Sequence, residues 1–557
     1  MIVEGEELQV KALDQWTRDL PSDAPRGEIL DRNGEILAGT STRYNIYVRP
    51  NSVENKEELA TVIASVLGFD KNKVLEKISK RVSEVTIATK VTKEDMSLLF
   101  ESGVKGIYYS EDNFRYYPNG DFMTQVLGFT GADGNGQTGL ESYYDKYLTG
   151  VNGSIITETD LIGRELEGGK SYYLPSISGL NVQTTLDARI QRIVEGIVEK
   201  AVALYDPKAV ACLVMDYTNG EIISLAEYPS FDLNNVPRND LEKLFSSSKS
   251  MLVSSVYEPG STFKILTAAS ALDLGVMSTS NRFYCSGSRV VDGKKIRCWK
   301  TKGHGSIDYG QGVESSCNCV FMDSALAMGT DKFYTYLKNF GLRTKTGVDM
   351  VGETSGLFID QSLVKTVDLA RIGFGQAVAV TPIGMMTACS AVINGGNTIY
   401  PHLVKSVSDN KGNSIDDVYV IRESKQVIKE ETSAIMRELL ERVVANGSGK
   451  GSGVNGYSIA GKTGTAQKYE NGAIAQGKYI SSFLGFSLES DAPYGVLLIV
   501  DEPKGYVYYG SLVAAPLVGD IYRSIFDLLS VPTSNSLDIE SGFNPENIEE
   551  YIDLIEE

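Results

Sequence analysis

The sequence predicts an α+β fold in which an antiparallel sheet, flanked by helices and carrying a helical subdomain, follows an elongated N-terminal α+β region. Apolar strand segments occur in pairs near residues 210–226 and 479–501, and helical segments fill the interval between the pairs. The pattern of predicted secondary structure also changes near residue 180, where a region of mixed short strands and helices ends. Strands at both ends of a segment, with helices between them, indicate a sheet closed by its own termini.

A chain of 557 residues exceeds what one hydrophobic core organises, so we expect two or three domains. We place the first at residues 1–180 and call it the pedestal, the second at residues 181–532, and an acidic tail at residues 533–557. With 42% hydrophobic and 22% charged residues, the chain belongs to the folded class. Its net charge of −19 argues against the basic face that nucleic-acid binding requires.

The pedestal is predicted to begin with a β-hairpin. Residues 26–37 read as two short strands around an Asn33-Gly34 turn. Lys56–Leu67 and Asp70–Ser79 carry apolar residues at helical spacing, and residues 131–139 are rich in Gly, Asp and Asn, as a loop is. No catalytic constellation occurs in this region, which favours a structural or interaction role.

The second region alternates predicted strands and helices. Its strands are expected at Asn181–Thr185, Val210–Asp216, Glu221–Ala226, Tyr479–Ser487 and Tyr494–Asp501. Its helices are expected at Asp187–Leu204, Phe263–Leu274, Asn318–Ala327, Asp331–Phe340 and Ser433–Val444. The Gly/Ser-rich run at residues 446–456 is typical of a flexible connection.

Ser261 is the predicted nucleophile. It follows Pro259-Gly260 and precedes an apolar helical pattern, which places it at a helix N-terminus, where free backbone N–H groups favour a developing oxyanion. Lys264 lies one turn further on the same face. Partly desolvated and beside a second cation, a lysine can be neutral enough to take the serine proton.

The Ser-x-x-Lys spacing alone is weak evidence. It also occurs at Ser102/Lys105, Ser246/Lys249, Ser362/Lys365 and Ser408/Lys411. None of these four has the Pro-Gly entry followed by a long apolar helix, and surface polarity explains each of them.

A second element lies about 50 residues further on, at Ser316-Cys317-Asn318. The Ser316 hydroxyl is suited to relay a proton to a leaving amine, and the Asn318 amide to hold Lys264 and a substrate carbonyl together. In isolation such a pair is far more often a helix N-cap.

A third element is the strand Lys462-Thr463-Gly464-Thr465. Small residues let a ligand backbone approach a strand edge, and Lys462 with Thr463 offers a cation and a hydroxyl to a substrate carboxylate. The Thr465 backbone N–H is a candidate second oxyanion donor beside that of Ser261. A Gly-rich turn with a solvated lysine is the common alternative.

The order of the three elements decides between these alternatives, because Ser-x-x-Lys, Ser-Asp-Asn and Lys-Thr-Gly together characterise penicillin-binding proteins and class A β-lactamases. Here Cys317 replaces the Asp, a position to which no chemistry is assigned. The chain resembles the class B penicillin-binding proteins. Arg26–Gly34 is similar to the pedestal signature of that class. Further similar segments are Arg115–Pro118, Gly128 and Gly139–Glu141, and the resemblance covers roughly residues 10–530.

The resemblance implies a peptidoglycan D,D-transpeptidase. Ser261 would attack the D-Ala–D-Ala carbonyl of a stem peptide, D-Ala would leave, and an amine of a second strand would take the acyl group. It also implies acylation by β-lactams, a membrane glycan polymerase as partner, and a position at the extracytoplasmic face of the cell membrane. Ala12–Trp16 and Tyr44–Pro50 are similar to the sporulation-specific branch, although septal and elongation homologues are close.

Two other functions stay open at this level. A serine β-lactamase would need a second base for deacylation, and no recognisable loop offers that carboxylate. A β-lactam sensor or cell-wall scaffold would be acylated without transferring the acyl group. The family usually has an N-terminal membrane anchor, and no stretch of this chain has the roughly 18–20 apolar residues of a membrane span.

A cysteine–histidine cluster precedes and overlaps the second element. Four of the six cysteines fall within 35 residues, together with His304, one of only two histidines. The donors Cys285, Cys298, His304 and Cys319 suit a tetrahedral structural Zn²⁺, with Cys317 as the alternative fourth ligand. Cys319 is preferred because Cys317 lies between two side chains that must both face the active site. A Cys285–Cys298 disulfide and simple buried thiols are the competing interpretations.

Overall fold

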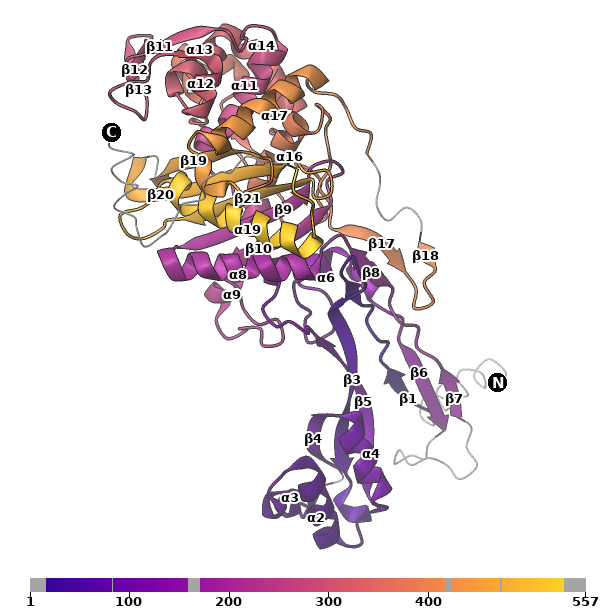
Figure 1. Cartoon of the computed structure of the whole chain (residues 1–557). Coiled ribbons are helices and arrows are strands. Elements are labelled where there is room, and N and C mark those ends of the chain that lie inside the picture. Colours follow the sequence, from indigo (N-terminus) through magenta and orange to yellow (C-terminus); the bar gives the residue numbers. More distant parts are fainter. Residues whose placement is uncertain (1–16, 83, 159–170, 416–421, 471–472, 535–557) are drawn as a thin grey trace.

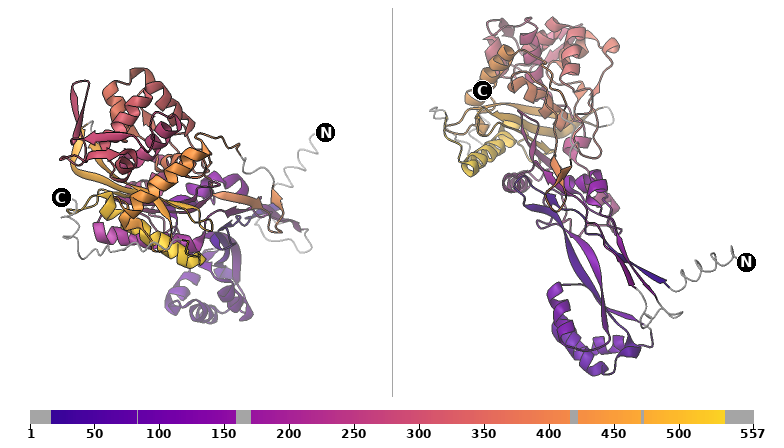
Figure 2. Two further views of the ribbon diagram at one scale, coloured as in Figure 1. Left: turned by 45° about the horizontal axis from the view of Figure 1, so that its top comes forward. Right: turned by 90° about the vertical axis from the view of Figure 1, so that its right-hand side faces the viewer.

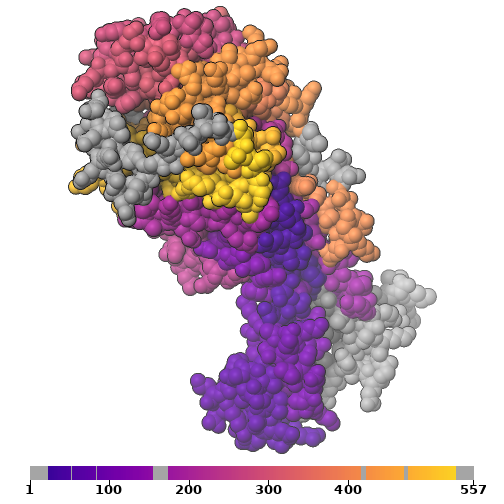
Figure 3. Space-filling view, viewed as in Figure 1, coloured from indigo at the N-terminus to yellow at the C-terminus, as the bar shows by residue number. Residues whose placement is uncertain are grey.

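The computed structural model describes residues 17–82, 84–158, 171–415, 422–470 and 473–534. A broad head, formed by most of the chain after residue 180, stands on a narrow stalk that the pedestal supplies (Figures 1 and 3). The predicted elongated shape is therefore present. The similar segment at Ala12–Trp16 and all but the first two residues of the acidic tail lie outside the described residues.

The centre of the head is a five-stranded antiparallel sheet of order β10-β9-β21-β20-β19. Its strands are β9 (Ala209–Asp216), β10 (Ile222–Tyr228), β19 (Ile459–Glu470), β20 (Ala473–Ser487) and β21 (Tyr494–Asp501). The prediction of a sheet closed by both ends of one segment is confirmed. Strand β19 lies at the edge, which leaves one side of its backbone open to a ligand.

The inner strands β9 and β21 read as continuous apolar runs because both faces of the sheet are buried there. Alternate residues of β9 enter two different cores: Val210, Cys212 and Val214 face α8 (Ala188–Tyr205) and α19 (Ala515–Leu529). Their neighbours Ala211, Leu213 and Met215 belong to the core shared with the helical subdomain. Helices α8 and α19 cover one face of the sheet, and the subdomain covers the other (Figure 1).

The helical subdomain confirms the predicted helices of the second region. Its main helices are α11 (Lys264–Asp273), α13 (Asn318–Met328), α14 (Thr330–Asn339), α16 (Pro382–Ile393) and α17 (Glu430–Ala445). Helix α16 was not predicted, because it is apolar all round and has no amphipathic period. The shorter helices of the head as a whole are α9 (Leu241–Ser248), α10 (Met251–Ser254), α12 (Tyr309–Glu314), α15 (Thr366–Ile372) and α18 (Gly510–Val513).

Short two-stranded sheets decorate the subdomain. Two of them lie between α11 and α12: β11 (Arg282–Cys285) pairs with β14 (Gly305–Asp308), and β12 (Ser288–Val291) pairs with β13 (Lys294–Arg297). We call residues 282–308 the cysteine lobe. A third small sheet joins β15 (Leu357–Phe358) and β16 (Val378–Ala379).

A mixed sheet joins the head to the pedestal. Its order is β18-β17-β8-β2-β3-β4, with β5 also paired to β3, and β2 with β8 is its parallel pair among the described residues. These strands are β2 (Ile29–Leu30), β3 (Ile36–Val48), β4 (Val85–Val91), β5 (Ile107–Tyr116), β8 (Asn181–Thr184), β17 (Val404–Ser408) and β18 (Ser414–Ile415). The predicted hairpin is confirmed by β2 and β3, and Gly34 adopts the left-handed φ of 87° that the turn requires.

The far end of the pedestal is a small lobe with its own core. Helices α2 (Lys56–Leu67), α3 (Lys71–Ile78) and α4 (Lys93–Glu101) pack there against β3 and β4. A separate three-stranded sheet runs alongside the stalk (Figure 2, right). The remaining pedestal elements are β1 (Thr17–Ser22), β6 (Gly153–Glu158), β7 (Ser171–Leu174), α5 (Thr124–Leu127), α6 (Gly139–Tyr143) and α7 (Asp145–Leu148).

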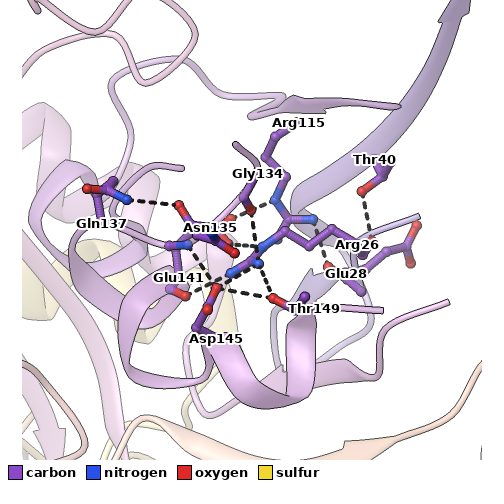
Figure 4. Close-up of polar contacts among 12 residues, drawn as sticks. Arg26, Glu28, Thr40, Arg115, Gly134, Asn135, Gln137, Glu141, Asp145 and Thr149 are labelled. Atoms are coloured by element: carbon purple, nitrogen blue, oxygen red, sulfur yellow. Dashed lines mark hydrogen bonds and ion pairs between the residues drawn. The ribbon is translucent and has the colours of Figure 1, made fainter. Parts of the chain in front are cut away.

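Glu141 holds the top of the pedestal together (Figure 4). Its carboxylate is fully buried and accepts from Arg26 Nε at 2.7 Å and from Arg115 Nε at 2.6 Å. Arg26 also pairs with Asp145 at 2.8 Å, and Arg115 donates to the Gly27 carbonyl at 2.7 Å. Arg26, Arg115 and Glu141 come from three of the pedestal segments that resemble the class B proteins, so the cluster gives those segments a structural role.

Glu141→Ala is expected to lower the free energy of unfolding by about 3–5 kcal/mol, because it removes the buried carboxylate that two nearly buried guanidinium groups share. Urea denaturation checks this. Glu84→Ala is the matched control, since Glu84 pairs with Arg49 across an exposed surface and such a pair contributes at most about 1 kcal/mol. Equal effects of the two substitutions would contradict the assigned role.

Within the described residues, no helix is both long and apolar enough to cross a membrane.

Candidate active site

Ser261 lies in a 3-10 turn, Gly260–Phe263, that runs directly into α11. The α-helix itself begins at Lys264, one residue later than the predicted start at Phe263. Gly260 has a φ of 53°, and its N–H donates to the Gly375 carbonyl at 3.1 Å, which fixes the turn. Ser261 is half-buried at the start of this helical segment.

Lys264 is almost fully buried behind the turn, with 1% of its surface exposed. Its Nζ donates to the Ser316 carbonyl at 2.8 Å, to the Ser316 Oγ at 3.0 Å and to the Asn318 Oδ1 at 2.7 Å. Burial lowers the pKa of Lys264 to about 8. The structure therefore brings the first two sequence elements into direct contact, 52 residues apart in the chain.

Ser316 and Asn318 do not serve as a helix cap. The residue at the N-cap of α13 is Cys317, whose side chain makes no capping hydrogen bond. Ser316 adopts a left-handed φ of 54°, and both it and Asn318 turn toward Lys264. A residue with a side chain rarely takes this conformation, so its neighbours must hold it there.

The third element lies on edge strand β19. Lys462 is fully buried, and its Nζ has no hydrogen-bond partner among the described residues. Its burial, and next the charge of Lys264, hold the pKa of Lys462 well below its usual value. A Cβ on Gly464 would lie 2.4 Å from Ser482 Oγ and 3.1 Å from Thr262 Cγ2, so only glycine lets β19 pack against the Ser261 turn.

The two threonines of β19 point to the other side of the strand. Thr463 Oγ1 lies 2.9 Å from Ser448 Oγ, and Thr465 Oγ1 accepts the Gly510 N–H at 2.9 Å. Ser448 belongs to the Gly/Ser-rich run that was predicted to be a flexible connection. In the structure this run contains a 3-10 turn, Lys450–Ser452, and the Ser452 side chain is fully buried, so the run is a folded part of the site.

All of these segments border one cleft of about 1440 Å³. The predicted residues that line it are Ser261, Ser316, Asn318, Thr463 and Thr465, and Lys264 and Lys462 lie buried beneath them. Lining residues that the sequence did not indicate include Trp299, Phe374, Gln376, Ser448 and Tyr509. Their spacing carries no signal, because four different loops bring them to the cleft. The one hint in the sequence was the position of Trp299 directly after Cys298, within the cysteine–histidine cluster.

The cysteine lobe closes one side of this cleft. Donor atoms of Cys285, Cys298, His304 and Cys317 all lie within 4.8 Å of one another. The Cys298 Sγ lies 3.7 Å from His304 Nδ1, and the buried His304 Nε2 has no hydrogen-bond partner among the described residues. All six cysteines are free, so Cys285 and Cys298 do not form a disulfide here.

The fourth residue of this group is Cys317, which the sequence indicated as the alternative to Cys319. Because Ser316 and Asn318 both face Lys264, the side chain between them turns the opposite way, and for Cys317 that direction is toward the lobe. Cys319 stays nearby on the first turn of α13, with its Sγ 3.5 Å from that of Cys285. Three thiols and an imidazole are a donor set that suits Zn²⁺.

The fold and the cleft define a penicillin-binding protein. The family model described as "Penicillin binding protein transpeptidase domain" matches residues 210–523, and the model described as "Penicillin-binding Protein dimerisation domain" matches residues 21–184. The chain belongs to the class B penicillin-binding proteins.

Among its relatives, the chain is 38% identical to stage V sporulation protein D of Bacillus subtilis (strain 168), over 97% of this chain and 84% of that protein. It is 26% identical to peptidoglycan D,D-transpeptidase FtsI of Escherichia coli (strain K12), over 91% of this chain and 84% of that one. In fold it matches penicillin binding protein 2X of Streptococcus thermophilus, with a TM-score of 0.79 over 94% of this chain and 82% of the other, at 24% identity.

Proposed function

We propose that this chain is a peptidoglycan D,D-transpeptidase that cross-links stem peptides through an acyl-enzyme on Ser261. The observation that carries the proposal is the buried amine of Lys264, held by Ser316 and Asn318 directly behind the Ser261 turn. With its pKa lowered to about 8, this amine is neutral in a useful fraction near neutral pH and can accept a proton.

In the acylation step, the Ser261 Oγ attacks the carbonyl carbon of the D-Ala–D-Ala bond while its proton passes to Lys264 Nζ. The backbone N–H groups of Ser261 and Thr465 would stabilise the oxyanion. The proton then reaches the leaving nitrogen through the Ser316 hydroxyl, which lies 3.0 Å from Lys264 Nζ. The C–N bond breaks, D-Ala leaves as the free amino acid, and an ester joins the stem peptide to Ser261.

In the transfer step, an amine of a second stem peptide attacks the ester carbonyl. One proton leaves the attacking nitrogen, the C–O bond to Ser261 breaks, and the proton restores the serine hydroxyl. The products are a new amide between two strands and the free enzyme. Asn318, whose amide oxygen already holds Lys264, is the proposed bridge to the substrate backbone.

Strand β19 is the proposed binding site of the donor peptide. An extended peptide can pair with an edge strand, and β19 is the edge of the central sheet. Thr463 and Thr465 line the cleft beside Ser261, where the Thr463 hydroxyl can donate to a terminal carboxylate. Lys462 lies beneath them and would add positive charge to that end of the cleft or, when neutral, a further proton acceptor.

Product analysis separates this function from its two alternatives. The chain, incubated with a stem pentapeptide and an acceptor amine, is expected to release D-Ala and form the amide product. A chromogenic β-lactam should give a stoichiometric burst. Rapid turnover of that β-lactam would indicate a β-lactamase, and acylation without any peptide product would indicate a sensor or scaffold.

The cellular role follows from the relatives. Identity of 38% over 97% of the chain to a stage V sporulation protein D supports a role in the cell wall made during sporulation. We place the domain at the extracytoplasmic face of the membrane, beside a membrane glycan polymerase that supplies its strands. Deletion should impair spore heat resistance and spare vegetative growth, whereas a division defect would assign the septal role instead.

We further propose that Cys285, Cys298, His304 and Cys317 hold one structural Zn²⁺. The donor atoms gather within 4.8 Å, and the cysteines are buried. The ion would brace the loop that carries Ser316 and Asn318, with Cys319 as a neighbour of the site. It is not required as a Lewis acid, because the Ser261 and Lys264 chemistry described above is complete without it.

Purified protein is expected to contain about one zinc per chain, by metal analysis, for this donor set. Cys298→Ser and Cys317→Ser should remove the metal, lower the thermal midpoint and slow acylation, because Zn²⁺ binding contributes folding free energy. Cys389→Ala is the control, since Cys389 is equally buried but lies in α16. Metal-free protein with two fewer titratable thiols than cysteines would indicate the disulfide instead.

A further inference from the structure

Trp299 stands at the border between the cysteine lobe and the cleft. It directly follows Cys298, and 52% of its surface is exposed, although tryptophan is usually well covered. It lines the same cleft as Ser261, Ser316 and Asn318. Core packing therefore does not explain the position of this indole.

The indole N–H is anchored on the catalytic loop. Trp299 Nε1 donates to the Ser315 carbonyl at 3.1 Å and to the Ser316 carbonyl at 3.2 Å. The Ser316 carbonyl also accepts Lys264 Nζ at 2.8 Å. A single carbonyl oxygen therefore receives both the indole and the amine that is proposed to take the serine proton.

This anchor lies where the backbone needs support. Ser316 holds a left-handed φ of 54°, which its side chain disfavours. The shared N–H of Trp299 is well placed to keep the two successive carbonyls of this turn in place. On its own side the ring meets the edge of His304, with the ring centres 5.4 Å apart at an angle of 67°. Trp299 thus bridges the cysteine lobe and the Ser316 turn.

We infer that Trp299 is a positioning residue for acylation and that its exposed ring forms an apolar wall against the donor stem peptide. The inference rests on the proposed function and extends it to a residue outside the three sequence elements. The N–H keeps Ser316 and Lys264 aligned, which acts on the rate of acylation. The ring face contacts the aliphatic part of the peptide, which acts on binding before acylation.

Two substitutions separate these roles. Trp299→Phe keeps an aromatic ring and removes the N–H, so the first-order acylation constant for a fluorescent penicillin should fall about tenfold, with the dissociation constant of the preceding complex nearly unchanged. Trp299→Ala removes the ring as well and should also weaken that complex about tenfold. Phe245→Ala, at a 69% exposed position on α9 that does not line the cleft, should change neither constant.

Each of the two roles can be overturned by a specific result. Acylation of Trp299→Phe at the wild-type rate would overturn the positioning role. A variant whose melting temperature is lowered and whose active fraction is reduced, but whose active molecules are acylated at the wild-type rate, would overturn it as well. An unchanged dissociation constant in Trp299→Ala would overturn the apolar wall. If the wild-type protein forms no adduct on Ser261, the proposed function fails instead, so the two failures are distinguishable.

A spectroscopic readout is available because the chain has only two tryptophans, Trp16 and Trp299. In a Trp16→Phe background, the emission reports Trp299 alone. Saturation with a β-lactam or a stem pentapeptide should shift or quench that emission as the ring is covered. Emission that is identical in the free and the acylated protein would contradict contact between the ring and the bound donor.

Discussion

Ser261→Ala is expected to abolish the covalent penicillin adduct and to lower D-Ala release on the order of 10⁴-fold or more. The substitution removes the atom that forms the ester, and the oxyanion donors and β19 alone supply only residual catalysis. Intact-protein mass spectrometry after incubation with penicillin checks the adduct. Because Ser261 is half-buried and the change is one oxygen atom, the melting temperature should stay close to that of the wild type.

The other Ser-x-x-Lys serines are natural controls for this experiment. The Ser102 Oγ donates to Leu99 O, the Ser246 Oγ to Lys243 O, and the Ser362 Oγ to the Asp360 side chain, all of which are local contacts. Ser362→Ala should be acylated like the wild type. Peptide mapping that places the adduct on any of these serines, or on Ser408, would overturn the assignment of Ser261.

Lys264→Met is expected to slow acylation about 10³-fold, within the range for loss of a positioned general base. Methionine fills a similar volume but leaves the Ser316 and Asn318 oxygens without the donor they now share. Lys264→Arg should fail as well, because a guanidinium is not deprotonated near neutral pH and cannot take the serine proton. Rapid mixing with a fluorescent penicillin measures the rate.

Folding and catalysis must be told apart in this variant. The melting temperature of Lys264→Met should fall by a few degrees at most, since removing a buried amine offsets part of the lost hydrogen bonding. Lys249→Met, the lysine of another Ser-x-x-Lys spacing, should keep the wild-type rate. Acylation of Lys264→Met within tenfold of the wild-type rate would exclude Lys264 as the base and direct attention to Lys462.

Local pattern explains why so much of the head could be predicted. The continuous apolar run of β9, the amphipathicity of α8 and the Asn33-Gly34 turn are each encoded within a few residues, so their boundaries agree with the structure to within one or two positions. Helix α16 escaped prediction because it is apolar on all sides. Strand β17 escaped because it is short and its partner, β8, lies more than 200 residues earlier in the chain.

By itself, the sequence determined where the central strands lie along the chain and that a cysteine–histidine cluster is present. It also singled out Ser261, Lys264, Ser316, Asn318 and the β19 residues as candidates. Only the tertiary structure decided that Cys317 rather than Cys319 joins the four-donor group, that the 446–456 run is folded, and that Trp299 contacts the Ser316 turn. The physical reason is that residue type and spacing indicate which side of a helix or strand a residue occupies. Contacts between segments 50 or more residues apart depend on tertiary packing, which no local pattern indicates.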